Sequence, residues 1–247
     1  MLKIIGIIIA IFIIIVGGLY IYNDRNKENN DPVGDITSAT MPDLDRELIF
    51  ADSVDKEARV AIGINKENND PVGDITSATM PDLDRELIFA DSVDKEARVA
   101  IGINIDNYTE LLKEDPTSYG NWLSLGLQRK IAGDYEAARD IWEYANILSP
   151  NNSISYHNLG DLYHFYLKDF PKSEENFKIA INHSPGAASY YINLHNLYKL
   201  SYKQDTTEAV NVLLIGIEVN PNNTDLLITL AVYYKDNDDN KNAKKYY

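Results

Sequence analysis

The sequence predicts an all-α chain with an apolar N-terminal helix, a largely irregular acidic spacer, and a solenoid of about three and a half helix pairs. Prolines recur at nearly constant intervals. Pro150, Pro185 and Pro221 lie 35 and 36 residues apart, and Pro116 precedes the first of them by 34. Such a period, with recurring small and aromatic positions, is typical of stacked helix pairs. The second observation is an uncharged run over residues 4–22, long enough to cross a membrane.

The first unit, residues 117–150, sets the pattern that the later units repeat. Apolar residues follow helical spacing as far as Gly133, and Gly126 lets the two helices approach closely. Gly133 and Asp134 are expected to end the first helix and cap the second, which Pro150 then ends. The remaining positions of the pattern are Trp122, Leu125, Arg129 (through the stem of its side chain), Ala138, Trp142 and Ala145.

The later units, residues 151–185, 186–221 and 222–247, depart from the pattern in three places. The second unit has one extra residue, which we place in the turn 167–170. In the third unit His195 stands at the glycine position, which is expected to loosen the packing locally. The fourth unit stops at Tyr247, which indicates either a truncated product or a contact of its last tyrosines with a partner.

These positions resemble the tetratricopeptide repeat (TPR) family over residues 117–247. The resemblance implies a right-handed superhelix that binds a peptide or protein in its groove, and the whole chain looks like a small membrane-anchored bacterial TPR protein. Groove positions would come from the first helix of each unit. The predicted groove residues are Leu123, Leu127, His157, Asn158, Asp161, His164, Phe165, Asn193, Asn196 and Lys199.

Three of these residues also allow a different interpretation. His157, Asp161 and His164 are spaced so that all three lie near one face of a helix, and two imidazoles with a carboxylate could hold zinc. The alternative is a polar peptide groove. We favour the groove, because no fourth ligand is visible, and we predict no metal site and no cofactor.

Residues 27–65 and 66–104 are identical over all 39 positions. No fold requires such identity, so it reports a recent tandem duplication or an assembly artefact. The second copy continues into a helical pattern over about 93–113, which we expect to cap the solenoid. The first copy lacks that continuation, and we expect a loosely held spacer with a short helix.

The N-terminal 26 residues are predicted to form a transmembrane anchor. Lys3 precedes the apolar run and a mixed, acidic flank follows it, which favours a cytoplasmic N-terminus and an extracytoplasmic TPR domain. The alternative is a cleaved signal peptide, with Val16 and Gly18 as small residues at the cleavage site, and a secreted product.

The composition and the missing motifs exclude several functional classes. A formal net charge of −15 argues against nucleic-acid binding, and the chain has no cysteine, phosphate-binding loop or serine elbow. We therefore predict a membrane-anchored, non-enzymatic scaffold that binds an unknown protein or peptide. The alternatives are a metal- or ligand-responsive accessory to a membrane enzyme and a truncated product without a specific role.

Overall fold

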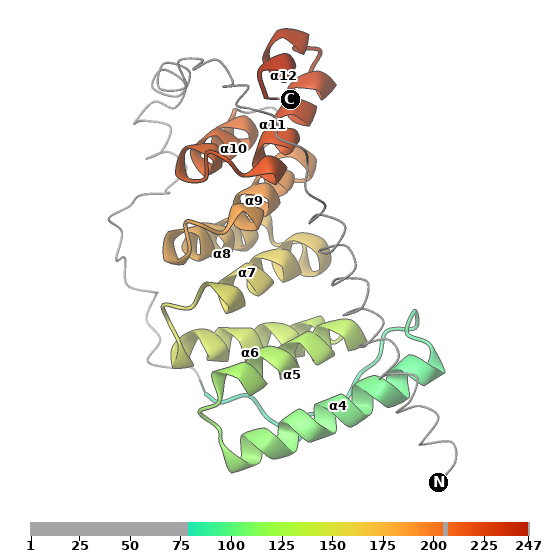
Figure 1. The fold of residues 1–247 in the computed structure, drawn as a ribbon. Coiled ribbons are helices and arrows are strands. Elements are labelled where there is room, and N and C mark those ends of the chain that lie inside the picture. Colours follow the sequence, from blue (N-terminus) through green and yellow to red (C-terminus); the bar gives the residue numbers. More distant parts are fainter. Residues whose placement is uncertain (1–78, 205–206, 247) are drawn as a thin grey trace, which may run out of the picture. The chain divides into compact units, whose positions relative to one another are not determined.

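The computed structural model of the chain describes residues 79–204 and 207–246, all of which belong to the compact unit Glu47–Tyr247. The predicted anchor at residues 4–22 and the first duplicated copy at 27–65 lie outside these residues. The described part is helical, without a strand, and Figure 1 shows the helices following one another in chain order from α4 to α12. The all-α fold class is confirmed for this part of the chain.

The helices pair as the repeat pattern predicts. Helix α4 precedes the pairs, and each pair joins a first helix to a second helix that packs against it. We call the first members the first helices and the others the second helices. The bounds are α4 Lys95–Glu114; α5 Tyr119–Ala132 with α6 Tyr135–Leu148; α7 Ser153–Leu162 and the π-helical turn η1 Tyr163–Leu167 with α8 Phe170–His183; α9 Ala188–Leu200 with α10 Glu208–Val219; and α11 Thr224–Asp236 with α12 Asn240–Tyr246.

The helix boundaries follow from capping residues. Gly133 ends α5 in the left-handed region at φ 90°, and the carboxylate of Asp134 accepts the Ala137 amide at 3.3 Å to begin α6, as predicted. Two first helices begin at asparagines of Pro-Asn-Asn turns. Asn152 caps α7 and Asn223 caps α11, each accepting a backbone amide of the first turn.

Glycine sets the distance between the two helices of a pair. A Cβ added at Gly126 would lie 2.4 Å from Nε1 of Trp142, and one at Gly160 would lie 2.5 Å from the Phe177 ring. In the third pair His195 occupies this position and is buried, with its Nδ1 2.8 Å from the Ala209 carbonyl oxygen. Leu213 stands where Trp142 and Phe177 stand, and this smaller side chain leaves room for the imidazole, while the loosening that we expected stays a prediction.

The extra residue of the second unit lies earlier than we predicted. It is accommodated in the π-helical turn η1, where one more residue enters each hydrogen-bonded turn. Lys168 then leaves the helix in the left-handed conformation at φ 58°, and Asp169 caps α8. The insertion therefore changes the end of a first helix and leaves the start of the second helix in register.

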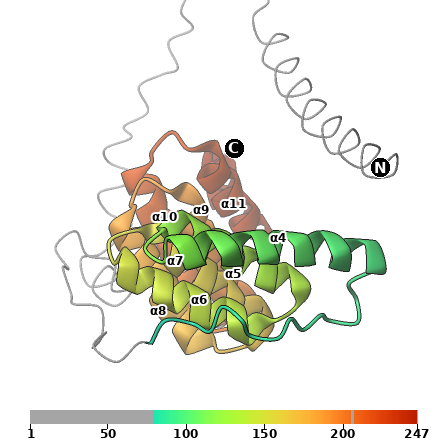
Figure 2. The same cartoon turned by 90° about the horizontal axis from the view of Figure 1, so that it is seen from below.

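An extended segment precedes α4 and runs along the first pair. We call residues 79–90 the strap; Figure 2 shows it in teal, passing beside α6. The Ala90 amide donates to the Ala132 carbonyl at 2.8 Å, at the end of α5. Leu83, Leu87 and Phe89 pack against the core that α4, α5 and α6 share. The strap thus belongs to the folded structure even though it contains no helix.

Helix α4 covers the first pair together with the strap. Its buried residues Ile101, Ile105 and Leu112 join the same core as Trp122 and Trp142. The helix expected over about 93–113 is therefore present, with ends at Lys95 and Glu114. Half of it comes from the second copy of the duplicated block, whose described residues, 79–104, lie against the solenoid.

Candidate functional site

Exposed apolar side chains are concentrated on the first helices. Of the fourteen large hydrophobic residues that are at least 38 % exposed in the described part, eight lie on α5, α7, η1, α9 or α11, five lie on the strap or α4, and only Val219 lies on a second helix. A solvated helix normally exposes polar residues on its outer side, so this asymmetry marks one layer of the fold. The eight residues are Leu127, Ile131, Ile154, Phe165, Tyr166, Leu200, Ile228 and Val232.

Polar contacts join neighbouring first helices across this layer. Lys130 of α5 lies 3.8 Å from Asp161 of α7, and Lys199 of α9 lies 2.8 Å from Asp236 of α11. Between them, the amide nitrogen of Asn193 on α9 lies 2.8 Å from Nε2 of His157 on α7. The first helices therefore lie side by side, and we call their shared outer surface the first-helix face.

The repeat places equivalent residues in rows across this face. Nine residues after the aromatic marker that opens each of the first three units come Ile131, Phe165 and Leu200, all exposed, whereas the fourth unit has Asp236 nine residues after its leucine marker. Five residues after the marker, Leu127 and Val232 belong to the outer units, while Asp161 and Asn196 belong to the inner ones. The face is thus apolar along one row over the first three units, and along the other it is polar in the middle and apolar at both ends.

The structure places most of the predicted groove residues on or near this face. Leu127 and Phe165 are exposed, and seven others are half-buried: Leu123, His157, Asn158, Asp161, Asn193, Asn196 and Lys199. Their role in binding stays a prediction. His164 is an error: it is 2 % exposed, and its Nε2 lies 2.9 Å from the hydroxyl of Ser201. Its ring also lies against Phe165 and Phe170, so the side chain is enclosed and does not line the open face.

The same geometry argues against the zinc interpretation. His157 stacks on Tyr190, with ring centroids 4.5 Å apart, and uses Nε2 for Asn193. His164 points to Ser201 instead, so the two imidazoles do not converge with Asp161. Within residues 79–204 and 207–246 no three metal-ligating side chains gather at one place.

Two buried histidines and one half-buried histidine make stability depend on pH. Burial lowers the pKa of His157, His164 and His195 below the usual value of 6.5, because the cation would lose its hydration. A lowered pKa means that the native state favours the neutral ring. The stabilisation is then complete above pH 6.5 and declines as the pH falls below it.

We predict that the urea midpoint is constant from pH 8 to 7 and falls from about pH 6.5 to pH 5. Carboxylates with lowered pKa, such as Glu174, add their own loss only at more acid pH, below their usual 4.5. Replacing His195 with glutamine should flatten the fall. An unfolding midpoint that stays level down to pH 5 would show that these rings are protonated without cost.

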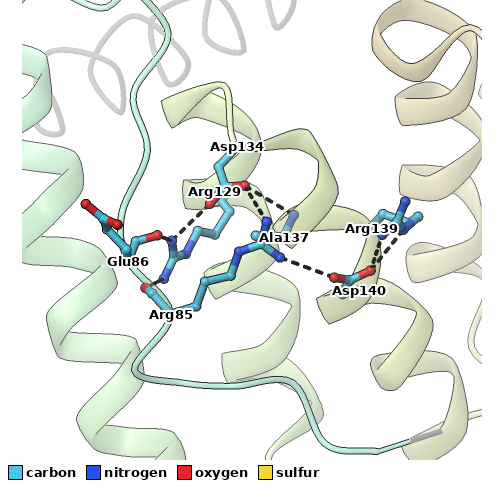
Figure 3. Close-up of polar contacts among 7 residues, drawn as sticks. All are labelled: Arg85, Glu86, Arg129, Asp134, Ala137, Arg139 and Asp140. Carbon is cyan, nitrogen blue, oxygen red and sulfur yellow. Dashed lines mark hydrogen bonds and ion pairs between the residues drawn. The ribbon is translucent and has the colours of Figure 1, made fainter.

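A second cluster of polar residues ties the strap to the first pair. Arg129 is 3 % exposed, and its guanidinium lies 3.0 Å from the carboxylate of Asp134. The same guanidinium donates to the carbonyl oxygens of Glu86 at 3.0 Å and Arg85 at 2.8 Å. Figure 3 shows Arg129 between Asp134 and these two carbonyls, with the Arg85 side chain reaching Asp134 and Asp140. We call Arg129 and Asp134 the latch.

Sequence reasoning missed the latch, although a signal was present. Arg129 stands at the position that holds Tyr163, Tyr198 and Tyr234 in the later units. The hydroxyls of Tyr163 and Tyr198 donate to Glu143 and Glu174, which belong to the second helix of the preceding pair. The first pair has no complete pair before it. The charged Arg129 at an otherwise aromatic position therefore indicated that this residue contacts a segment other than a preceding second helix.

A membrane span is not found in this part of the chain. No helix within the described ranges is both long and apolar enough to cross a bilayer. The predicted anchor at residues 4–22 lies outside those ranges.

Comparison with solved structures identifies the class of fold. The crystal structure of MamA matches with a TM-score of 0.50 and 21 % identity, covering 64 % of this chain and 92 % of MamA. YrrB, described as a TPR protein with an unusual peptide-binding site, matches at 15 % identity and a TM-score of 0.45, over 61 % of this chain and 76 % of YrrB. The helix pairs, their glycine contacts and the MamA match define a TPR-type α-solenoid.

Similarity in sequence is confined to part of the chain. BBSome complex member BBS4 of Bos taurus is 32 % identical over 104 residues, which is 42 % of this chain and 19 % of BBS4. The Mus musculus protein of the same name is 30 % identical over the same length. The chain thus spans about a fifth of these relatives, and no family model matches it.

Proposed function

We propose that the chain is a protein-interaction scaffold that binds a peptide segment of an unknown protein partner on its first-helix face. The observation that supports this proposal most is the asymmetry of the exposed apolar residues, eight on the first helices against one on the second helices. Isolated apolar residues on a surface need no explanation, but a gathering on one layer is typical of an interaction site.

The arrangement favours a ligand with apolar side chains along one edge. Ile131, Phe165 and Leu200 offer a row of contacts on three successive first helices, and each residue keeps about half of its surface exposed. Covering such side chains contributes about 25 cal/mol for each Å² removed from water. The amide of Asn196 and the carboxylate of Asp161 can bond the ligand's main chain in the middle of the face.

We predict that acidic substitutions on this face abolish binding. The test is selection of peptides from a displayed random library on the full-length protein in detergent micelles, followed by titration of the selected peptides. Leu127→Asp with Leu200→Asp should weaken binding at least tenfold, because each introduces an unpaired charge into an apolar contact.

Val219→Asp is the matched control, since it makes the same change on the exposed surface of a second helix. It should leave the dissociation constant unchanged. Equal losses in both variants would mean that the peptides bind elsewhere, and selection of no peptide at all would count against the scaffold.

We also propose that residues 4–22 anchor the chain in a membrane, with the solenoid on the extracytoplasmic side. The support is the length of the apolar run and the lysine before it. Protease added to intact cells should then digest the solenoid. Full protection of the solenoid would reverse the proposed orientation.

A further inference from the structure

The strap is bound to the solenoid as a peptide would be. It has no helix of its own, and apart from local turn hydrogen bonds its polar contacts go to the first pair and to α4. The Ala90 amide donates to Ala132, the latch arginine binds two strap carbonyls, and the guanidinium of Arg98 donates to the Ala90 carbonyl at 3.1 Å. We call the surface that makes these contacts the strap site.

Side chains of the strap give the site its selectivity. Leu87 and Phe89 pack on the core, and Cδ2 of Leu87 lies 3.9 Å from the Cβ position of Gly102. Arg85 reaches the carboxylates of Asp134 and Asp140 at 3.4 and 3.3 Å. Ile88 is 55 % exposed and contributes little. The site therefore recognises a segment with three apolar anchors, the last two of which flank an exposed residue, and with a basic residue after the first anchor.

The chain carries a second segment of this kind. Residues 40–51 repeat the strap letter for letter, so Arg46, Leu48 and Phe50 correspond to Arg85, Leu87 and Phe89. We propose that the strap site also binds residues 40–51 of the same chain, as a reserve strap that takes the site when residues 79–90 leave it. Every side chain that the site contacts in the strap is present in the reserve segment.

The tethers decide which segment occupies the site. Four residues, 91–94, join the strap to α4, whereas 43 residues, 52–94, would join the reserve segment to it. The effective concentration of a tethered ligand falls roughly as the −3/2 power of tether length, so the strap has an advantage of about 35-fold. Residues 79–90 therefore hold the site in the unaltered protein. A change that lowers the affinity of residues 79–90 for the site by much more than about 35-fold should let residues 40–51 bind there instead.

Hydrogen exchange of the full-length protein tests this exchange of segments. Leu87→Ala with Phe89→Ala should weaken the strap at least roughly a hundredfold, through lost apolar burial. Peptides that cover residues 40–51 should then become protected, and those from 79–90 should lose protection. The substitutions also change the mass of one segment, so that the two otherwise identical segments can be distinguished.

Ile88→Ala is the matched control, because it alters an exposed residue of the same strap and should leave residues 40–51 unprotected. Adding Leu48→Ala and Phe50→Ala should remove the protection again and lower stability further. When residues 27–65 are deleted, Leu87→Ala with Phe89→Ala should lower the free energy of unfolding by more than it does in the full-length protein. The proposal is overturned if residues 40–51 stay unprotected in the strap variant. It is also overturned if the variant with all four substitutions is no less stable than the variant with two. Protection that appears only as the protein concentration rises would indicate binding between chains and would overturn it as well.

Discussion

Replacing Arg129 with leucine should lower the free energy of unfolding by about 3–5 kcal/mol, the largest effect that we expect of a single substitution. Removing one partner of a buried ion pair leaves the other charge without compensation. The Asp134 carboxylate is 1 % exposed and would keep only its longer contact with Arg85, at 3.4 Å, and two strap carbonyls would also lose their donor. The strap should therefore detach, which hydrogen exchange of residues 79–90 would show alongside urea unfolding. The reserve segment cannot compensate, because Arg129 binds the main chain and would be missing for either segment.

Arg139→Leu is the matched control for this prediction. Arg139 also pairs with an aspartate, at 2.6 Å from Asp140, but its side chain is 33 % exposed and its partner's 40 %. Solvent screens such a pair, so its loss should cost less than about 1 kcal/mol. Equal losses in the two variants would mean that burial of the latch adds nothing, and an intact strap in Arg129→Leu would show that the apolar anchors hold it without the latch.

The repeat pattern predicted most of the solenoid because each of its signals acts locally. Gly133 adopts a conformation that glycine favours, Asp134 caps the next helix with its own carboxylate, and Gly126 leaves space for a ring. These effects depend on residue type and on near neighbours. The period of the prolines then sets the order of the pairs along the chain.

The strap and His164 could not be predicted in the same way, for different physical reasons. The strap has no helical or alternating period, and main-chain atoms and a buried ion pair from residues more than forty positions away hold it in place. His164 was placed on the first-helix face by counting residues. Its equivalents Lys130 and Lys199 are half-buried, but the imidazole is enclosed by Phe165 and Phe170 and bonds Ser201, contacts that the repeat position alone does not reveal.

The equivalence of units explains why the first pair needs a strap. In the second and third pairs a tyrosine of the first helix donates to a glutamate of the preceding second helix. At the first pair, α4 covers α5, while the strap lies beside α6 and meets the arginine that replaces the tyrosine. The second copy of the duplicated block thus supplies the strap and the first half of α4, which together with the second half of α4 cover the N-terminal end of the solenoid.

Adding one methyl group at Gly126 should destabilise the protein by about 2 kcal/mol. The new Cβ would lie 2.4 Å from Nε1 of Trp142, and the indole cannot retreat because it is buried and donates to the Leu123 carbonyl. Overpacking of this kind costs roughly 1–3 kcal/mol and exceeds the gain in helix propensity that alanine brings. Urea unfolding of Gly126→Ala would measure the effect.

Gly120→Ala is the control for this substitution, since nothing lies within 4 Å of its Cβ position in the same helix, and it should stabilise the protein by about 0.5 kcal/mol. The third pair suggests the compensating change, because it combines His195 with Leu213 where the first combines Gly126 with Trp142. Trp142→Leu should therefore cost less in the Gly126→Ala background than on its own, as the added methyl fills part of the space that the indole leaves. Strict additivity of the two changes would show that these residues do not share one packing volume. The distance between the two helices would then not be set by the contact of Gly126 with Trp142.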